Sequence, residues 1–246
     1  MDAHTPDRAI DCPVCGSTGF TPLFRKENQQ FVRCNDCALV LINPRPFLSE
    51  LRAVYDADYS GAYIRKGASK RRRARKRVAL LRQRYAPAGR WLDVGCSAGF
   101  LLEAAAATGF DVYGVDVEAA GVAHAREVLG FRNVFCGQLE ALSLPSAAFN
   151  VITMYDVIEH VPDLNVVAAA LRRLLAPGGI LHLRTPDVGH WRRTRELSRW
   201  PEVKPSEHLY YFDKRTLPAL LAKHGLRLRA SHFTWKPALS MVFVHA

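Results

Sequence analysis

The sequence predicts an α/β fold with a seven-stranded, mostly parallel sheet and a small cysteine-rich module in front of it. From Arg90 onward, apolar runs rich in strand-forming residues alternate with stretches of helical periodicity, and two Cys-x-x-Cys pairs lie near the start of the chain. A chain of 246 residues has room for one full α/β domain and one smaller unit. We therefore predict a module at 1–46, a basic helical connector at 47–88 and an α/β domain at 89–246, with separate cores in the module and the domain.

Seven segments of the α/β region have the length and composition of strands. In chain order they are Arg90–Val94, Asp111–Val117, Asn133–Cys136, Asn150–Tyr155, Gly179–Thr185, Leu226–Thr234 and Met241–Ala246. Helical runs fill the main intervals, including one at Thr216–His224 that Gly225 ends as a C-cap, and this alternation indicates parallel pairing. No helix separates the last two segments. Lys236 and Pro237 form a turn there, so we expect a hairpin that gives the sheet an antiparallel edge strand.

Four N-terminal cysteines have the spacing of a structural zinc site. Cys12 and Cys15 form one pair, Cys34 and Cys37 form the other, and 18 residues separate the pairs. Four thiolates on two knuckles complete a tetrahedral shell for Zn²⁺, at about 2.3 Å. Disulfides would need an oxidising compartment, and the sequence has no export signal, so we expect zinc in a cytoplasmic protein. Because four protein ligands leave no open position, this zinc-ribbon-like module should use the metal for structure rather than for catalysis.

The excess positive charge is confined to one segment. The chain has a net charge of +11, and twelve Lys or Arg with no Asp or Glu lie between Asp58 and Asp93, which leaves the rest close to neutral. Within the segment, Ala74, Val78 and Leu81 recur at helical spacing and predict an amphipathic helix. No apolar run approaches the ~18 residues that a membrane span needs, so we expect no membrane partner.

A glycine loop follows the first strand of the α/β domain. The run Trp91–Phe100 reads as a buried strand, a turn containing Gly95 and Gly99, and the start of a helix, an arrangement that lets a ligand approach bare backbone and free N–H donors. Asp116 ends the second strand, where it can accept hydrogen bonds from two ribose hydroxyls. The loop lacks the full G-x-G-x-x-G spacing of dinucleotide binders, so a nucleoside without a pyrophosphate is favoured.

Four segments carry a resemblance to a known family. The segments LDVGCSAG, GVDV, FNVITMYDVIEHVPD and LLAPGGILHLRTPD resemble, in this order, the motifs of class I S-adenosylmethionine-dependent methyltransferases. The resemblance covers Trp91 to Ala246 and implies a Rossmann-like fold, S-adenosyl-L-methionine as the cofactor and methyl transfer as the activity.

The resemblance also implies roles for individual residues. Asp93 should lie near the methionine part of the cofactor, and Gln138 stands where the family often has Asp, although its amide can still bond the exocyclic amine of adenine. Asp156 matches a position that faces the substrate. The cofactor-binding residues so implied are Asp93, Gly95, Cys96, Ser97, Gly99, Asp116, Val117, Gln138, Leu139 and Tyr155.

Methyl transfer from a sulfonium requires an aligned nucleophile and, for some acceptors, a base, but no metal. His160 and His208 are the candidate bases, because both lie in stretches expected to follow strands at their C-terminal ends, where ligands bind. Each has a structural alternative. His160 could orient its loop through the backbone, and His208 could be packed within an aromatic lid formed by the insertion before the last helix.

The acceptor is open to three interpretations. The cysteine module and the tyrosine-containing stretch after it resemble a methyltransferase subgroup of polysaccharide and secondary-metabolite pathways, which makes Tyr59 and Tyr63 acceptor-site candidates and a sugar or secondary metabolite the expected acceptor. An RNA methyltransferase that uses the basic segment 65–84 is the first alternative, although no aromatic residue lies between Tyr63 and Tyr85 to stack bases. A non-catalytic nucleoside-binding scaffold is the second. The oligomeric state is not predicted.

Overall fold

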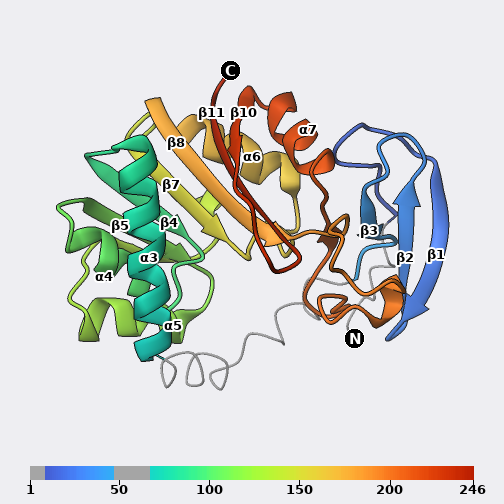
Figure 1. Ribbon diagram of the computed structural model, residues 1–246, viewed down its shortest axis with the longest axis horizontal. Coiled ribbons are helices and arrows are strands. Elements are labelled where there is room, and N and C mark those ends of the chain that lie inside the picture. Colours follow the sequence, from blue (N-terminus) through green and yellow to red (C-terminus); the bar gives the residue numbers. More distant parts are fainter. Residues whose placement is uncertain (1–8, 47–66) are drawn as a thin grey trace, which may run out of the picture.

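Two sheets organise the part of the chain that the structure describes, residues 9–46 and 67–246 of a computed structural model. Seven strands form the larger sheet, in the order β10-β11-β8-β7-β4-β5-β6, and four form the smaller one, in the order β1-β2-β3-β9. In Figure 1 the smaller sheet, mostly blue, lies at the far end of the molecule from α4 and α5. Within the described ranges, no helix is long and apolar enough to cross a membrane.

The larger sheet confirms the predicted Rossmann-like α/β fold. Four neighbouring pairs, β4–β5, β4–β7, β5–β6 and β7–β8, are parallel, and the last strand, β11, is antiparallel to both β8 and β10. The strands are β4 (Arg90–Val94), β5 (Asp111–Asp116), β6 (Val134–Cys136), β7 (Phe149–Tyr155), β8 (Leu175–Pro186), β10 (Leu226–Ser231) and β11 (Ala238–His245).

The sequence predicted that the antiparallel strand lies at the edge of the sheet, but the structure places it one strand further in. β11 lies between β8 and β10, and β10 forms the edge. The difference in burial between β10 and β11 explains this order. All but the last residue of β11 are buried, so this strand needs neighbours on both sides, whereas β10 exposes Arg227, Leu228 and Arg229. Charged residues on an edge strand also oppose pairing with another chain.

Helices cover both faces of the larger sheet. On one face, α3 (Gly67–Tyr85), α4 (Phe100–Ala106) and the π-helical turn η1 (His124–Val128), which continues α5 (Ala119–Ala123), pack in one apolar cluster. On the other face lie α6 (Leu164–Leu174) and α7 (Thr216–Lys223). Two short 3₁₀ turns, η2 (Leu139–Ala141) and η3 (Leu197–Arg199), complete the helical elements of the described residues.

The predicted amphipathic helix is α3, which packs against α4. Its buried residues include Ala74, Val78 and Leu81, as the spacing indicated. Not all of its positive charge faces solvent, because Arg71 pairs with Glu103 of α4 at 2.7 Å.

The smaller sheet is completed by a strand from the second half of the chain. The N-terminal strands are β1 (Phe20–Lys26), β2 (Gln29–Cys34) and β3 (Val40–Ile42), and β9 (Tyr210–Tyr211) comes from the insertion between β8 and α7. β9 pairs antiparallel with β3, opposite Val40 and Leu41. An apolar cluster spans the junction and consists of Phe31, Val40, Ile42, Trp200, Val203 and Tyr211.

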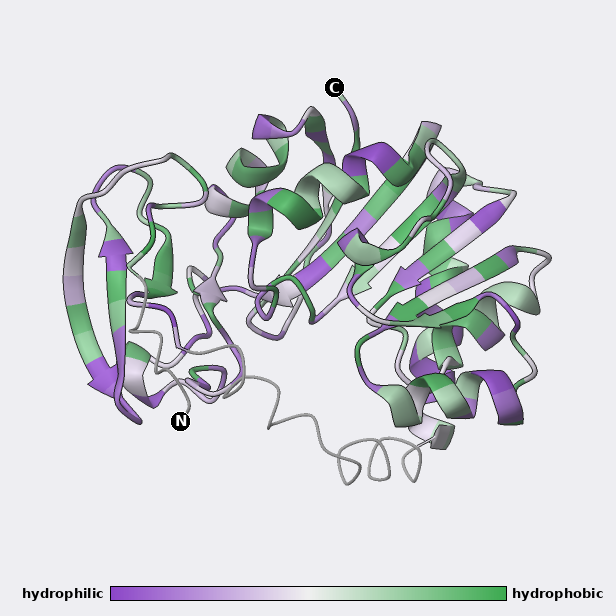
Figure 2. Cartoon of the chain, turned by 180° about the vertical axis from the view of Figure 1, so that it is seen from behind, coloured by the Kyte–Doolittle hydropathy of each residue, from purple (hydrophilic) through white to green (hydrophobic). Residues whose placement is uncertain are grey.

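The module and the α/β domain share one core, so the expectation of separate cores was wrong. Cys12, Val32 and Leu41 belong to the same buried cluster as the residues of α6 and α7. In addition, the Lys223 Nζ donates a hydrogen bond to the backbone oxygen of Pro13 at 3.2 Å. Figure 2 shows stretches of hydrophobic residues along the strands of both sheets. The N-terminal strands alone are too small to bury these residues, and the helices beside them supply the missing cover.

Candidate active site and metal centre

The C-terminal ends of the parallel strands bring the predicted ligand-binding residues together. The glycine loop follows β4, Asp116 ends β5, and Tyr155 ends β7, next to Arg184 of β8 in the register of the sheet. This is the edge at which open α/β sheets bind their ligands.

The glycine loop needs its glycines. Gly95 and Gly99 have φ values of 80° and 81°, in the left-handed region. A Cβ on Gly95 would collide with the side chain of Val157, and one on Gly99 would lie 2.9 Å from the Cβ of Ala125. The loop therefore owes its shape to two positions where a side chain would be strained and also crowded.

Asp116 links β5 to this loop. Its Oδ2 accepts a hydrogen bond from the backbone N–H of Ser97 at 2.7 Å, and its Oδ1 accepts one from Glu118 at 2.9 Å. Burial raises the pKa of Asp116, and these two backbone bonds oppose the rise. The carboxylate is thus held at a fixed place beside the loop, as a ribose-binding group would be.

Apolar and amide side chains follow β5 and β6 beside Asp116. The backbone N–H of Gly137 donates to the backbone oxygen of Asp116 at 2.8 Å, which brings the ends of the two strands together. Val117 is 56% exposed although it is apolar, Gln138 precedes the turn η2, and Leu139 is buried. An exposed valine and an amide beside a carboxylate form a surface on which a nucleobase could stack.

Asp93 lies inside β4, under the site. Its Oδ1 accepts a hydrogen bond from the Thr153 hydroxyl at 2.7 Å. Burial raises the pKa of Asp93 to about 7, against the opposing effects of that hydrogen bond and of the positive charge of Arg77.

Sequence reasoning missed Arg77. Its guanidinium lies 4.3 Å from the ring centre of Tyr155, and burial lowers its pKa. The signal was present, because Arg77 sits three residues after Ala74 and four before Leu81, on the side of α3 that the apolar spacing assigns to the core. A partly buried cation on that face is a functional candidate that a count of charges alone does not reveal.

Arg184, also missed, neutralises Asp156. Its Nη1 contacts both carboxylate oxygens of Asp156, at 2.5 and 2.6 Å. Asp156 itself has a φ of 57° in the left-handed region. The structure thus places Asp156 at the predicted edge, but with its charge already paired.

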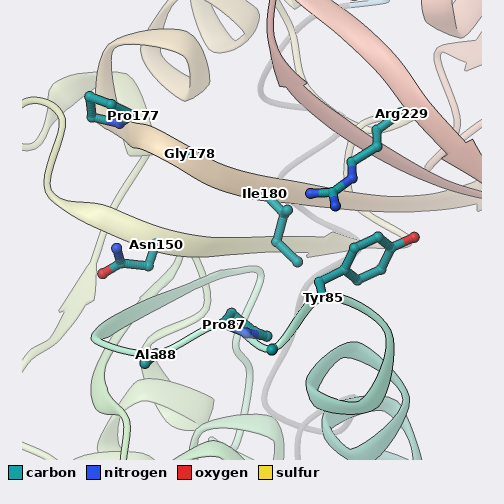
Figure 3. Close-up of a pocket in the computed structure, with 9 residues that line it drawn as sticks. Tyr85, Pro87, Ala88, Asn150, Pro177, Gly178, Ile180 and Arg229 are labelled. Carbon is teal, nitrogen blue, oxygen red and sulfur yellow. The ribbon is translucent and has the colours of Figure 1, made fainter.

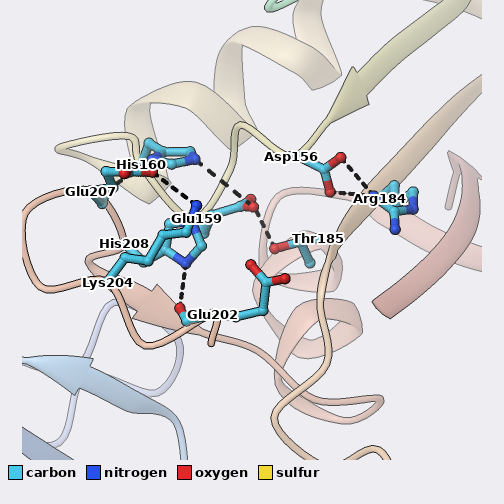
Figure 4. A network of polar contacts seen from close by, with 9 residues as sticks. All are labelled: Asp156, Glu159, His160, Arg184, Thr185, Glu202, Lys204, Glu207 and His208. Carbon is cyan, nitrogen blue, oxygen red and sulfur yellow. Dashed lines mark hydrogen bonds and ion pairs between the residues drawn. The ribbon is translucent and has the colours of Figure 1, made fainter. Parts of the chain in front are cut away.

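The two candidate bases lie against each other. The ring centres of His160 and His208 are 4.7 Å apart, and Figure 4 shows both rings near the Glu159 carboxylate. Oxygen Oε1 of Glu159 lies 4.0 Å from the Nε2 of His160. Burial lowers the pKa of His160 and takes that of His208 to about 3, while burial and the nearby Asp156 raise the pKa of Glu159 to about 8. Glu159 was not predicted, although it directly precedes His160.

The four N-terminal cysteines meet as the spacing predicts. Their sulfur atoms all lie within 4.8 Å of one another, with Cys12 next to Cys37 and Cys15 next to Cys34, each at 3.4 Å. Burial would raise the pKa of the Cys34 thiol, but hydrogen bonds from the backbone and from the other cysteines outweigh it and lower that pKa to about 7. Four convergent thiols, one of them easily ionised, fit a tetrahedral structural Zn²⁺. Ala38, which stands in the second knuckle, takes a φ of 65°, where glycine would be less strained.

Tyr59 and Tyr63, together with the first two residues of the basic segment, lie outside the described residues. A cavity of about 230 Å³ lies at the opposite edge of the larger sheet, among Ala88, Asn150, Gly178 and their neighbours near the starts of β4, β7 and β8 (Figure 3).

The chain is similar to known methyltransferases in sequence and in fold. A family model described as a methyltransferase domain matches residues 67–231. Curated relatives include two proteins named ubiquinone biosynthesis O-methyltransferase. That of Psychrobacter arcticus is 38% identical over 104 residues, which cover 38% of this chain and 39% of the relative. That of Pseudomonas paraeruginosa is 38% identical over 117 residues, which cover 44% of this chain and 50% of the relative. The matches thus span half or less of the length of these relatives.

Solved structures share the fold at low identity. An amino pentose methyltransferase of Micromonospora echinaspora, with S-adenosylmethionine bound, superposes with a TM-score of 0.60 at 22% identity, over 78% of this chain and 98% of that one. An S-adenosylmethionine-dependent methyltransferase of Clostridium acetobutylicum gives a TM-score of 0.59 at 11% identity, over 78% of this chain and 100% of the other.

Proposed function

Because the chain belongs to the class I S-adenosylmethionine-dependent methyltransferases, we propose that it transfers a methyl group from S-adenosyl-L-methionine to a small molecule, a sugar or a secondary metabolite. The observation that carries the proposal is the hydrogen bond between the Asp116 carboxylate and the backbone of Ser97 in the glycine loop. It joins the two elements that a nucleoside cofactor needs at one edge of a parallel sheet.

Each part of the cofactor has residues of matching chemistry. Asp116 takes the ribose hydroxyls, and the loop from Gly95 to Gly99 approaches the cofactor with bare backbone. The adenine stacks on Val117 and Leu139, with Gln138 at its exocyclic amine. The methionine part is zwitterionic, so its carboxylate suits Arg77 and its ammonium suits Asp93. These two residues are close enough for the charge of Arg77 to lower the pKa of Asp93.

The proton of the acceptor goes to an imidazole in this proposal. The Nδ1 of His160 bonds the backbone oxygen of Glu207 at 2.9 Å, and the Nδ1 of His208 bonds that of Glu202 at 2.7 Å. A carbonyl only accepts, so each Nδ1 carries the hydrogen and each Nε2 carries the lone pair. Either Nε2 can accept a proton. Both imidazoles are neutral at neutral pH, because burial lowers both pKa values.

A small acceptor is supported by the relatives and by the basic helix. The relatives' names refer to ubiquinone biosynthesis and to an amino pentose, both small molecules. On α3, Arg71 is paired with Glu103 and Arg77 is partly buried against Tyr155, so part of the charge that an RNA would need is already used within the protein. The four cysteines are proposed to hold a structural Zn²⁺.

The test has two arms on the same preparation. Titration calorimetry with S-adenosylhomocysteine should give one binding site, and a structured RNA should bind weakly, with affinity lost between about 50 and 200 mM salt. No heat with S-adenosylhomocysteine would contradict the cofactor assignment and favour a scaffold. RNA binding that persists at physiological salt, and that substitution of Arg72 and Arg73 removes, would replace the small molecule by an RNA.

A further inference from the structure

We propose that Glu159, His160 and His208 form a second metal site, which binds a divalent transition-metal ion such as Zn²⁺ through one carboxylate oxygen and two imidazole nitrogens. One ligand atom from each of the three residues lies within 4.8 Å of the other two. Ligand atoms around a tetrahedral Zn²⁺ with bonds of about 2.0–2.2 Å lie a little over 3 Å apart, so small side-chain movements would close the shell.

Both imidazoles are oriented as metal ligands usually are. A ligating histidine typically donates its other ring N–H to a carbonyl or carboxylate, which fixes the tautomer and the ring plane. Here the Nδ1 of His160 is held by the Glu207 carbonyl at 2.9 Å, and that of His208 by the Glu202 carbonyl at 2.7 Å. The lone pairs are therefore on the Nε2 atoms, and that of His160 lies on the side of the Glu159 carboxylate.

Only one of the two carboxyl oxygens of Glu159 has a hydrogen-bond partner among the described residues. Oxygen Oε2 of Glu159 accepts a hydrogen bond from the Thr185 hydroxyl at 2.8 Å. Oxygen Oε1 is buried without a hydrogen-bond partner among the described residues, in a side chain only 1% exposed. An unpartnered polar oxygen in the interior is costly, and a cation placed between it and two imidazoles would remove that cost.

The insertion is tied to the loop after β7, so that the ligands are held before any ion binds. The backbone N–H of Leu209, the residue after His208, donates to the backbone oxygen of Glu159 at 2.8 Å. Two positive charges act on the cluster, and both are paired: Lys204 with Glu207 at 3.2 Å, and Arg184 with Asp156. The site is thus assembled from two chain segments by main-chain bonds.

Two histidines and one glutamate make three ligands, and such zinc sites keep a position open for water or substrate. His160 is the most exposed of the three, with 17% of its side chain accessible, so the open position is expected on its side. If the proposed methyl transfer holds, on which this last step rests, the open position suits an acceptor that offers a hydroxyl oxygen. A cation there would lower the pKa of that hydroxyl, so that its proton could leave to a solvent water and the two imidazoles would not be needed as bases.

The test measures bound metal in the full-length protein. The chain is incubated with Zn²⁺, dialysed against metal-free buffer and analysed for zinc per chain by mass spectrometry. We expect two equivalents in the unaltered protein and one in Glu159→Gln and in His208→Gln. His224→Gln is the matched control, because His224 is a histidine bonded to Asn165 on another part of the surface, and it should keep two.

A second readout separates this proposal from the proposed function. S-adenosylhomocysteine affinity, measured on the same variants, should be unchanged, which also shows that they are folded. One equivalent in the unaltered protein, lost in Cys34→Ser, would overturn the second site, as would two equivalents in Glu159→Gln. A protein that holds two equivalents but binds no S-adenosylhomocysteine would keep the site and refute the methyltransferase proposal.

Discussion

Asp116 and Asp111 stand at opposite ends of β5, and only Asp116 is proposed to bind the cofactor. Asp116 receives two backbone N–H groups and is mostly buried, whereas Asp111 is half-exposed and pairs with Arg90 at 3.3 Å. An exposed ion pair contributes little, while a fixed carboxylate beside a ligand contributes much.

The first prediction compares these two residues. Asp116→Ala should weaken S-adenosylhomocysteine binding by more than tenfold, about 1.4 kcal/mol or more, because the charge-assisted bonds to the ribose are lost. Asp111→Ala should leave the affinity unchanged. Titration calorimetry on both variants checks this, and equal affinities for the two would refute the role of Asp116.

The second prediction concerns pH. With a pKa of about 7, Asp93 is largely protonated at pH 6 and ionised at pH 8. The ligand ammonium binds the ionised form, so binding releases a proton below pH 7, and affinity should rise by up to about tenfold between these two values. Asp93→Asn should flatten the profile. A steep rise that persists in Asp93→Asn would assign the titration to another group.

At this scale, the sequence was informative about residues that carry a motif and silent about residues brought in by packing. The structure places Gly95, Asp116 and Tyr155 at the expected edge. Arg77 and Glu159 were not predicted, because their environment depends on burial and on residues distant in the sequence, neither of which can be derived from the order of the residues. The roles of His160 and His208 stay predictions.

At the scale of elements, the turn from β4 into α4 can be compared with the turn after α4. Gly95 and Gly109 both have positive φ, yet an added Cβ would collide with Val157 at Gly95 and would meet nothing within 4 Å at Gly109. The two positions therefore separate backbone strain from crowding.

The third prediction uses this pair. Gly95→Ala should weaken S-adenosylhomocysteine binding and lower the thermal midpoint, because the loop must move away from Val157. Gly109→Ala should lower only the thermal midpoint. An alanine in the left-handed region reduces the free energy of unfolding by about 1 kcal/mol, without touching the loop. Thermal unfolding and calorimetry are the measurements. An intact affinity in Gly95→Ala would show that the loop tolerates a side chain.

Strand positions were predictable because apolar periodicity and turn residues mark them locally. Strand order was harder. The position of β11 inside β10 depends on which of the two strands is apolar on both faces. The strand β9 has only two residues, which is too few to show any periodicity.

The molecule as a whole behaves as one core rather than as two. The fourth prediction follows from this. Cys34→Ser should release the proposed zinc and also lower the stability of the α/β domain, so that unfolding remains one transition at a lower midpoint. Cys136→Ser, at an exposed cysteine outside the cluster, should change neither. Two separated transitions in Cys34→Ser would restore the picture of independent cores, and the boundaries proposed at 46 and 88 with it.

The pairing of β3 with β9 also sets an order of events during synthesis. Val40 leaves the ribosome long before Tyr211, its partner in the sheet. At roughly 5–20 residues per second, the N-terminal strands wait about ten to thirty seconds for the strand that covers their edge. For that time an apolar edge is available to other chains. A chaperone that covered this edge would therefore matter more to the nascent chain than to the finished protein.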